Sequence, residues 1–239
     1  MAIIDGGIDV SLDGFNKTSK GLPKIIDCFD FTGAGNVDTS LIKIMDSENT
    51  LIGLSGRTVK IPSNWKNPSG KFHLGIKSLH KPELPDSTTK ILEEIEKFPE
   101  IDCIVWFDGE KWVAACIDIS FNENLENFKI LQNYRNGHEY GTLFGNVTYC
   151  VTINNEGNSL EIFMSYSRHG SCVAQIAAAH FPDESKKDGL APGAQIISMN
   201  VLHPMIRNRL DENAIKKAFK KSIEMRVDII NYSCAWPTQ

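Results

Sequence analysis

Residues 168–181 read RHGSCVAQIAAAHF, and this stretch decides the predicted fold. Alanine dominates it and a proline follows, so we expect a helix over 169–181 that ends before Pro182. Val173, Ile176 and Ala177 fall on one stripe, which indicates the side of the helix that faces the core. The stretch therefore predicts an amphipathic helix that packs on another layer of structure.

Strands and helices alternate on both sides of this stretch. Residues 195–201 and 228–233 are apolar runs typical of buried strands, and 213–225 between them is predicted to be a helix with four lysines outward. Its residues expected to face inward are Ile215, Phe219 and Ile223. Near the start, Ala2 to Ile4 form a third apolar run, which stops at Asp5-Gly6-Gly7. This alternation is typical of a parallel α/β sheet, in which ligands collect at the carboxyl ends of the strands.

The middle of the chain has a different character, with short β-type runs separated by turn signals. The runs lie at 25–26, 101–107, 111–119, 148–153 and 160–165. One helix is expected among them, at 87–98, where Pro99 ends it. We therefore predict an incomplete parallel α/β domain formed by residues 1–21 and 166–239, interrupted by a β-rich insert at 22–165.

The composition excludes several classes of protein. The chain has 239 residues, of which 41% are hydrophobic and 23% charged, and its net charge is −5, all within the ordinary globular range. Its basic residues are dispersed, so we expect no nucleic-acid partner. No run approaches the roughly 20 apolar residues that span a bilayer. Residues 1–10 lack a basic leader, so we expect no membrane partner, no export and a cytoplasmic location.

The spacing of cysteines and histidines predicts no metal site and no cofactor. The six cysteines never form a Cys-x-x-Cys pair, and the other histidines show no paired ligand spacing. We expect free thiols that are buried as small hydrophobes. Cys172 lies one helical turn from His169, and we expect it to pack in the core rather than to form a Cys–His pair.

Two residues carry the candidate chemistry, Asp5 at the end of the first strand and His169 at the start of the Ala-rich helix. A carboxylate can hold the imidazole tautomer and stabilise the imidazolium, which makes two thirds of a catalytic triad. The start of a helix disfavours the protonated imidazole, which suits a general base. Taken singly, Asp5 before two glycines is typical of a turn, and His169 is typical of a surface or packing position.

Further strings resemble a known family. They are LPKIID (22–27), TGAG (32–35), GLSGR (53–57), AAAHFP (177–182), GLAPGAQI (189–196) and NYS (231–233). Together, in this order and nearly from end to end, they resemble the tripeptidyl-peptidase II family of the subtilisin superfamily, whose serine peptidase triad runs Asp, His, Ser. Asp5 and His169 are 169 − 5 = 164 positions apart, against roughly thirty in plain subtilisin. A large insert between the two residues is a feature of this family.

The resemblance implies the fold, the activity and the site residues. It implies a subtilisin-like sheet with Asp5 as triad acid and His169 as triad base. Asn231 and Ser233 correspond to the strand whose backbone pairs with an extended peptide substrate. The family's activity is the release of tripeptides from the free amino termini of cytosolic oligopeptides, and its subunits assemble into large homo-oligomers.

The sequence also departs from the family's pattern. No Gly-Thr-Ser string occurs in the 239 residues, so the serine nucleophile and the oxyanion Asn expected before it are missing. The two acids that hold the substrate's amino terminus fall, counted without gaps, on Leu210 and Trp236; Asp211 or Glu212 could replace the first.

These departures leave two hypotheses open. In the first, the chain is an N-terminal portion of such a peptidase and is inactive alone. In the second, it is a non-catalytic paralogue that binds full-length subunits as an assembly or regulatory module. The changed amine-binding positions favour the second hypothesis, and the abrupt ends of the sequence favour the first.

Overall fold

The computed structural model describes residues 1–80, 99–118, 125–204 and 211–234, which form two compact units. Of these residues, unit 1 contains 1–34, 80 and 163–234, and unit 2 contains the remainder. The helix predicted at 87–98 lies outside the described residues. Within the described residues, no helix is both long enough and apolar enough to cross a membrane.

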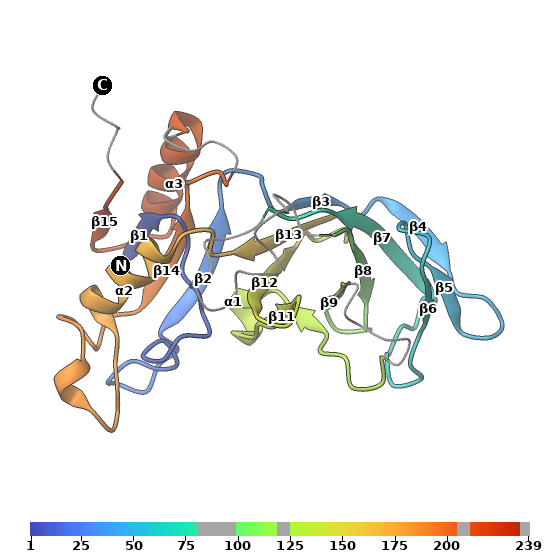
Figure 1. Ribbon diagram of the computed structural model, residues 1–239, viewed down its shortest axis with the longest axis horizontal. Coiled ribbons are helices and arrows are strands. Elements are labelled where there is room, and N and C mark those ends of the chain that lie inside the picture. Colours follow the sequence, from blue (N-terminus) through green and yellow to red (C-terminus); the bar gives the residue numbers. More distant parts are fainter. Residues whose placement is uncertain (81–98, 119–124, 205–210, 235–239) are drawn as a thin grey trace. The chain divides into compact units, whose positions relative to one another are not determined.

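Unit 1 is built on a four-stranded parallel sheet with the order β15-β1-β14-β2 (Figure 1). The strands are β1 (Ala2–Asp5), β2 (Ile25–Asp30), β14 (Ile196–Asn200) and β15 (Ile230–Tyr232). β1 and β14 are buried along their whole length, as expected for the central strands of a sheet covered on both faces. The predicted parallel α/β fold is thus confirmed.

Helices α2 (Arg168–Ala178) and α3 (Glu212–Glu224) cover opposite faces of this sheet. Side chains alternate along a strand, so Ala2 and Ile4 lie on one face of β1 and Asp5 on the other. α3 packs with the first face, in one buried cluster with Ala2 and Ile4. α2 approaches the second face, where its first turn lies against Asp5. The site is therefore formed on the α2 side of the sheet.

The helix faces differ from the prediction. The buried residues of α2 are Gly170, Ser171, Ala174 and Ala178, and those of α3 are Ala214, Ala218 and Ser222. The predicted apolar stripes were wrong at Ile176 and Ile223, which are about three-quarters exposed, at 75% and 76%, whereas Ile215 is partly buried against the core as predicted. Small side chains let the helix axes lie close to the sheet, and the larger apolar residues are displaced toward the sides of the helices.

Replacing Ile223 with glutamine tests this orientation of α3. Because the side chain is exposed, the free energy of unfolding should change by less than about 0.5 kcal/mol. Ala218→Leu, on the buried face, should cost about 2 kcal/mol through overpacking. Chemical denaturation measures both values, and a larger loss for Ile223→Gln than for Ala218→Leu would mean that the predicted stripe faces the core after all.

The boundaries between the units also differ from the predicted ones, which lie between residues 21 and 22 and between residues 165 and 166. The compact units divide between Ala34 and Gly35 and between Ile162 and Phe163. β2 accounts for most of the difference, because it pairs in parallel with β14 and so extends the sheet of unit 1. The short apolar run at 25–26 belongs to this sheet and not to the β-rich part of the chain.

Unit 2 consists mainly of β-strands. Its sheets have the orders β10-β9-β8-β7-β4 and β11-β12-β13-β3, and β5 and β6 form a separate hairpin. The elements are β3 (Asn36–Asp38), β4 (Leu41–Ile44), β5 (Thr50–Ile52), β6 (Thr58–Lys60), β7 (Lys71–Lys77), β8 (Ile101–Phe107), β9 (Trp112–Ile117), β10 (Leu131–Gln132), α1 (Tyr134–Gly137), β11 (Gly141–Leu143), β12 (Val147–Ile153) and β13 (Ser159–Met164). Trp65 and Trp106 stack within its core, with ring centroids 4.7 Å apart.

The GLSGR string at 53–57 has a structural role in unit 2. Asp102, buried in β8, accepts a hydrogen bond from the Ser55 backbone N–H (3.0 Å) and forms an ion pair with Arg57 (2.9 Å). Arg57 also donates to the Ile117 carbonyl at the end of β9 (3.0 Å). A buried carboxylate needs such partners, so the string attaches the β5–β6 hairpin to the central strands.

Candidate active site

The structure brings the two predicted site residues of unit 1 together. His169 Nδ1 lies 2.8 Å from Asp5 Oδ2, although 164 positions separate the residues in sequence. Asp5 is 1% exposed, and its second oxygen accepts the Gly6 backbone N–H at 2.7 Å. The His169 side chain is 57% exposed. A buried carboxylate therefore holds one nitrogen of an accessible imidazole.

Local structure determines where each residue of this pair lies. Asp5 is the last residue of β1, and His169 lies in the first turn of α2, whose N-cap Ser167 accepts the His169 backbone N–H. The loop after β1 is attached to α2, because Ser171 Oγ accepts the Asp9 N–H at 2.9 Å. Gly170 permits this close approach, since a Cβ there would lie 2.3 Å from the Gly7 carbonyl oxygen.

This geometry fixes the chemistry available to the imidazole. The Asp5 carboxylate accepts a hydrogen bond, so in the neutral form of His169 the proton is on Nδ1 and Nε2 keeps its lone pair. Nε2 is then able to take a proton from a hydroxyl group, and Asp5 stabilises the imidazolium that results. The pair can act as a general base with its orienting carboxylate; the catalytic roles of Asp5 and His169 stay predictions.

Two further polar residues align with Asp5 at the ends of adjacent strands. Asp5 is in register with Asn200, which is in register with Asp30. Asn200 Nδ2 donates to Asp30 Oδ1 at 3.1 Å, and both side chains are buried. Burial and the negative charge of Asp30 raise the pKa of Tyr166. Asp30 and Asn200 were not among the predicted site residues, because β2 was assigned to the insert; a carboxylate at the end of a third parallel strand would have been the signal.

The cysteines of unit 1 correct one prediction. Cys28 is buried as expected, but Cys172 is exposed and Cys234 is half-buried. Cys172 lies outside the buried face of α2, so it is not a core thiol. Burial, together with the charge of Asp5, raises the pKa of Cys234 to about 12. The Cys234 thiol is therefore protonated at neutral pH.

Of the predicted substrate-contact residues, Asn231 lies on the edge strand β15 and Ser233 follows the end of that strand. Asn231 is in register with Ile3 of β1, and Ser233 Oγ donates to Asn231 Oδ1 at 2.7 Å. In the described part of the chain, β15 pairs with β1 alone. Substrate contact by Asn231 and Ser233 stays a prediction.

Two acids are predicted to bind the amino terminus of the substrate, and the structure bears on only part of this prediction. Leu210 and Trp236 lie outside the described residues. Asp211 is the N-cap of α3, where its side chain accepts the N–H groups of Asn213 and Ala214. Glu212 pairs with Lys216 at 3.5 Å on the same helix. Both acids that could replace Leu210 thus have local partners.

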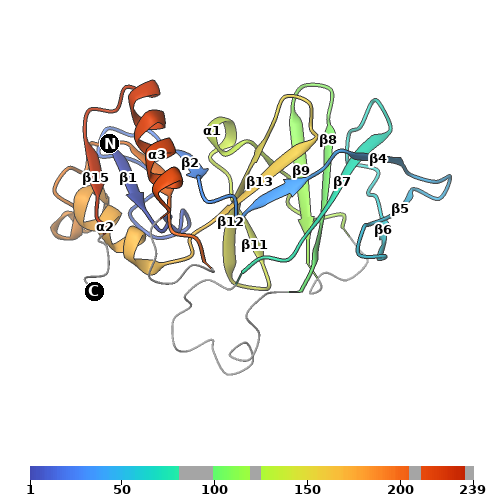
Figure 2. The same ribbon diagram turned by 90° about the horizontal axis from the view of Figure 1, so that it is seen from above.

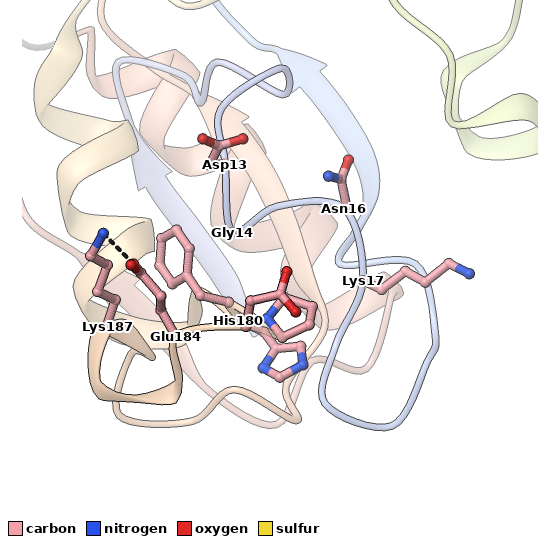
Figure 3. A pocket seen from close by; sticks show the side chains of 10 residues that line it. Asp13, Gly14, Asn16, Lys17, His180, Glu184 and Lys187 are labelled. Atoms are coloured by element: carbon pink, nitrogen blue, oxygen red, sulfur yellow. Dashed lines mark ion pairs between the residues drawn. The ribbon is translucent and has the colours of Figure 1, made fainter.

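A separate pocket of about 470 Å³ lies between residues 13–17 and 180–187 (Figure 3). His180 borders it, and His180 Nδ1 lies 3.2 Å from the Asp188 carboxylate. The Phe181 backbone N–H, with a smaller contribution from His180, lowers the pKa of Asp188. The pocket contains neither Asp5 nor His169. In the described residues, no group of three or more His, Cys, Asp or Glu side chains could hold a metal ion.

A parallel α/β sheet with a strand-end Asp that orients a His on the following helix is the arrangement of the subtilisin-type serine peptidases. The chain belongs to the Subtilase family (Peptidase S8), which it matches over residues 1–238. The resemblance deduced from the sequence motifs is thereby confirmed.

Similar sequences and structures show which members of the Subtilase family this chain resembles. Tripeptidyl-peptidase 2 of Caenorhabditis elegans is 32% identical over 98% of this chain and 21% of its own length. Tripeptidyl-peptidase 2 of Arabidopsis thaliana is 30% identical over 99% of this chain and 22% of its own length. A crystal structure of tripeptidyl peptidase 2 superposes with a TM-score of 0.74 at 22% identity, covering 97% of this chain and 23% of that one, and so shows the shared fold. The chain thus spans about a fifth of the length of these relatives.

Proposed function

We propose that Asp5 and His169 form the acid–base half of a serine exopeptidase site. The observation that carries the proposal is the 2.8 Å contact between His169 Nδ1 and the buried Asp5 carboxylate. In such a site the imidazole removes the proton of a serine hydroxyl as that oxygen attacks the peptide carbonyl, and later returns the proton to the leaving amine. His169 Nε2 is the proposed proton acceptor, and Asp5 holds the ring.

We further propose that the serine and the oxyanion donor come from sequence outside the 239 residues. Support comes from the relatives, whose length is about five times the matched portion. The proposed substrates are cytoplasmic oligopeptides from which tripeptides are released, bound as an added strand at Asn231 and Ser233. Sequencing the transcript downstream of codon 239 tests this: an in-frame continuation with Gly-Thr-Ser supports it, and a stop codon contradicts it.

By itself, the 239-residue chain should hydrolyse no peptide. It has no serine in the Gly-Thr-Ser context, and loss of a single oxyanion donor already costs roughly 3 kcal/mol of transition-state stabilisation. We expect no turnover of an Ala-Ala-Phe amide and no labelling by a fluorophosphonate, with subtilisin labelled in parallel as the control. Stoichiometric labelling of a serine in the folded chain would refute the proposed inactivity.

A second candidate function is that of a non-catalytic module that binds full-length subunits. Exposed apolar side chains on α3, on β15 and at the residue before β15 favour it: Phe219, Ile223, Ile229, Ile230 and Tyr232. Exposed apolar groups of this kind are typical of contact surfaces. Co-purification with a co-expressed full-length subunit, lost in an Ile223→Glu/Ile229→Glu variant, would support this function, and no co-purification at high concentration would count against it.

A further inference from the structure

Two buried cysteines face each other in the central strands of unit 2. Cys103 on β8 is directly opposite Cys116 on β9 in an antiparallel register that runs unbroken from Asp102–Ile117 to Phe107–Trp112. The two side chains are 0% and 1% exposed. Figure 2 shows the two strands side by side. The register therefore places the two thiols directly opposite each other on adjacent strands.

The position of this pair in the ladder brings its backbones close together. At the turn, the Asp108 N–H donates to the Lys111 carbonyl at 3.0 Å, which makes 108 and 111 a hydrogen-bonded pair. Hydrogen-bonded and non-hydrogen-bonded pairs alternate along an antiparallel ladder. Cys103 lies 108 − 103 = 5 positions before Asp108 on the same strand. Five is an odd number, so Cys103 and Cys116 form a non-hydrogen-bonded pair, with Cα atoms about 4.5 Å apart.

That separation suits a disulfide, which requires Cα atoms about 4.4–6.8 Å apart. The interaction with the neighbouring Cys116 thiol is the main cause that raises the pKa of Cys103, and burial adds to it. Burial, with a smaller contribution from both cysteines, raises the pKa of Tyr149 on β12. The two sulfurs and the phenol thus form one buried cluster.

The cluster lies on the face of β8 and β9 away from the main core. Ile104 and Ala115 belong to the core cluster that contains the stacked tryptophans. Because side chains alternate along a strand, Cys103 and Cys116 point to the other face. A bond between them would cross-link two central strands without displacing the aromatic core.

We propose that Cys103 and Cys116 form a modification site that closes to a reversible cross-strand disulfide when the folded protein meets a low-molecular-weight disulfide. Two S–H bonds break and one protein S–S bond forms. The two electrons and two protons pass to the small disulfide, whose S–S bond is reduced to two thiols. A thiol reductant reverses the exchange by the same route.

Burial sets the rate of this reaction. The thiolate is the attacking species, and the raised pKa of Cys103 leaves little of it at neutral pH. Access also requires local opening of the strands. The pair should therefore react at least about tenfold more slowly than an exposed thiol such as Cys172, and faster as the pH rises.

Peptide mapping of the folded chain tests the proposal. The protein is incubated with oxidised glutathione, unfolded in iodoacetamide and digested with trypsin, which cleaves after Lys111, the one basic residue between the two cysteines. We expect a linked peptide pair that contains Cys103 and Cys116 and separates on reduction. The buried Cys28 and Cys150 serve as internal controls, and we expect to find both only in the alkylated form.

Two outcomes would overturn the proposal. One is full alkylation of Cys103 and Cys116 after an incubation about a hundredfold longer than the one that fully glutathionylates the exposed Cys172, since the slower reaction of the buried pair has then had time to finish. The other is a linked pair that forms only when denaturant is present during oxidation. A Cys103→Ser variant should give no linked pair through Cys116; the wild-type result decides the matter if this variant does not fold.

Discussion

Replacing Gly170 with alanine should lower the free energy of unfolding by about 3 kcal/mol, because a Cβ in this packed position forces the backbone to move. The new atom would lie 2.3 Å from the Gly7 carbonyl oxygen and 3.2 Å from Asp5 Cβ. Helix propensity alone predicts the opposite sign, a gain of about 1 kcal/mol. Relieving the clash moves the first turn of α2 away from β1, so His169 should also lose its contact with Asp5.

Denaturant unfolding with a matched control measures this effect. Gly193→Ala is the control, since a Cβ there meets its nearest neighbour at an ordinary 3.4 Å and no positive φ angle opposes the substitution. The control should change stability by less than about 1 kcal/mol. A Gly170→Ala protein as stable as the wild type would show that α2 does not lie as close to Asp5 as described.

Replacing Lys24 with methionine should cost about 4 kcal/mol, because it removes a buried cation that has satisfied several carbonyl groups. Lys24 is fully buried and donates to the carbonyls of Ala178 at the end of α2 (2.5 Å), Pro192 (2.7 Å) and Ala194 (3.0 Å). Of these, Pro192 also accepts the Ser19 N–H. The substitution thus leaves the Ala178 and Ala194 carbonyls without this donor.

Stability as a function of pH gives an independent check on Lys24. Burial lowers the pKa of Lys24 from 10.5 to about 8. Between these two values the unfolded chain binds more protons than the folded chain, so the wild-type free energy of unfolding should rise with pH in this window. The rise should disappear in Lys24→Met and persist in Lys20→Met, whose side chain is exposed. An identical pH dependence in all three proteins would contradict the buried position of Lys24.

Local signals in the sequence were sufficient to locate the Asp5–His169 pair. An apolar run that ends in Asp-Gly-Gly and an Ala-rich helix that begins at a His define a strand end and a helix start without reference to distant residues. Once the strand is assigned to a parallel sheet and the helix to one face of it, Asp5 and His169 are expected to lie close together. The structure places His169 Nδ1 2.8 Å from Asp5 Oδ2.

Features that depend on distant partners could not be predicted in this way. β2 is a short run whose partner β14 lies about 170 positions away, so its parallel pairing left no local signal, and Asp30 and Asn200 were missed with it. The inward faces of α2 and α3 are lined by alanine, glycine and serine. Hydrophobicity favours Ile176 and Ile223, whereas the close packing of helix on sheet selects the small residues.

The protonation state of His169 tests the central claim most directly. In ¹⁵N-labelled protein, NMR of the histidine rings at a pH high enough to leave them neutral should show His169 protonated at Nδ1 and not at Nε2, with a strongly deshielded Nδ1 proton that disappears in Asp5→Asn. His138, which no carboxylate contacts among the described hydrogen bonds and ion pairs, provides the internal comparison. A His169 ring protonated at Nε2, or an Nδ1 resonance that is the same in the wild type and in Asp5→Asn, would contradict the proposed acid–base pair.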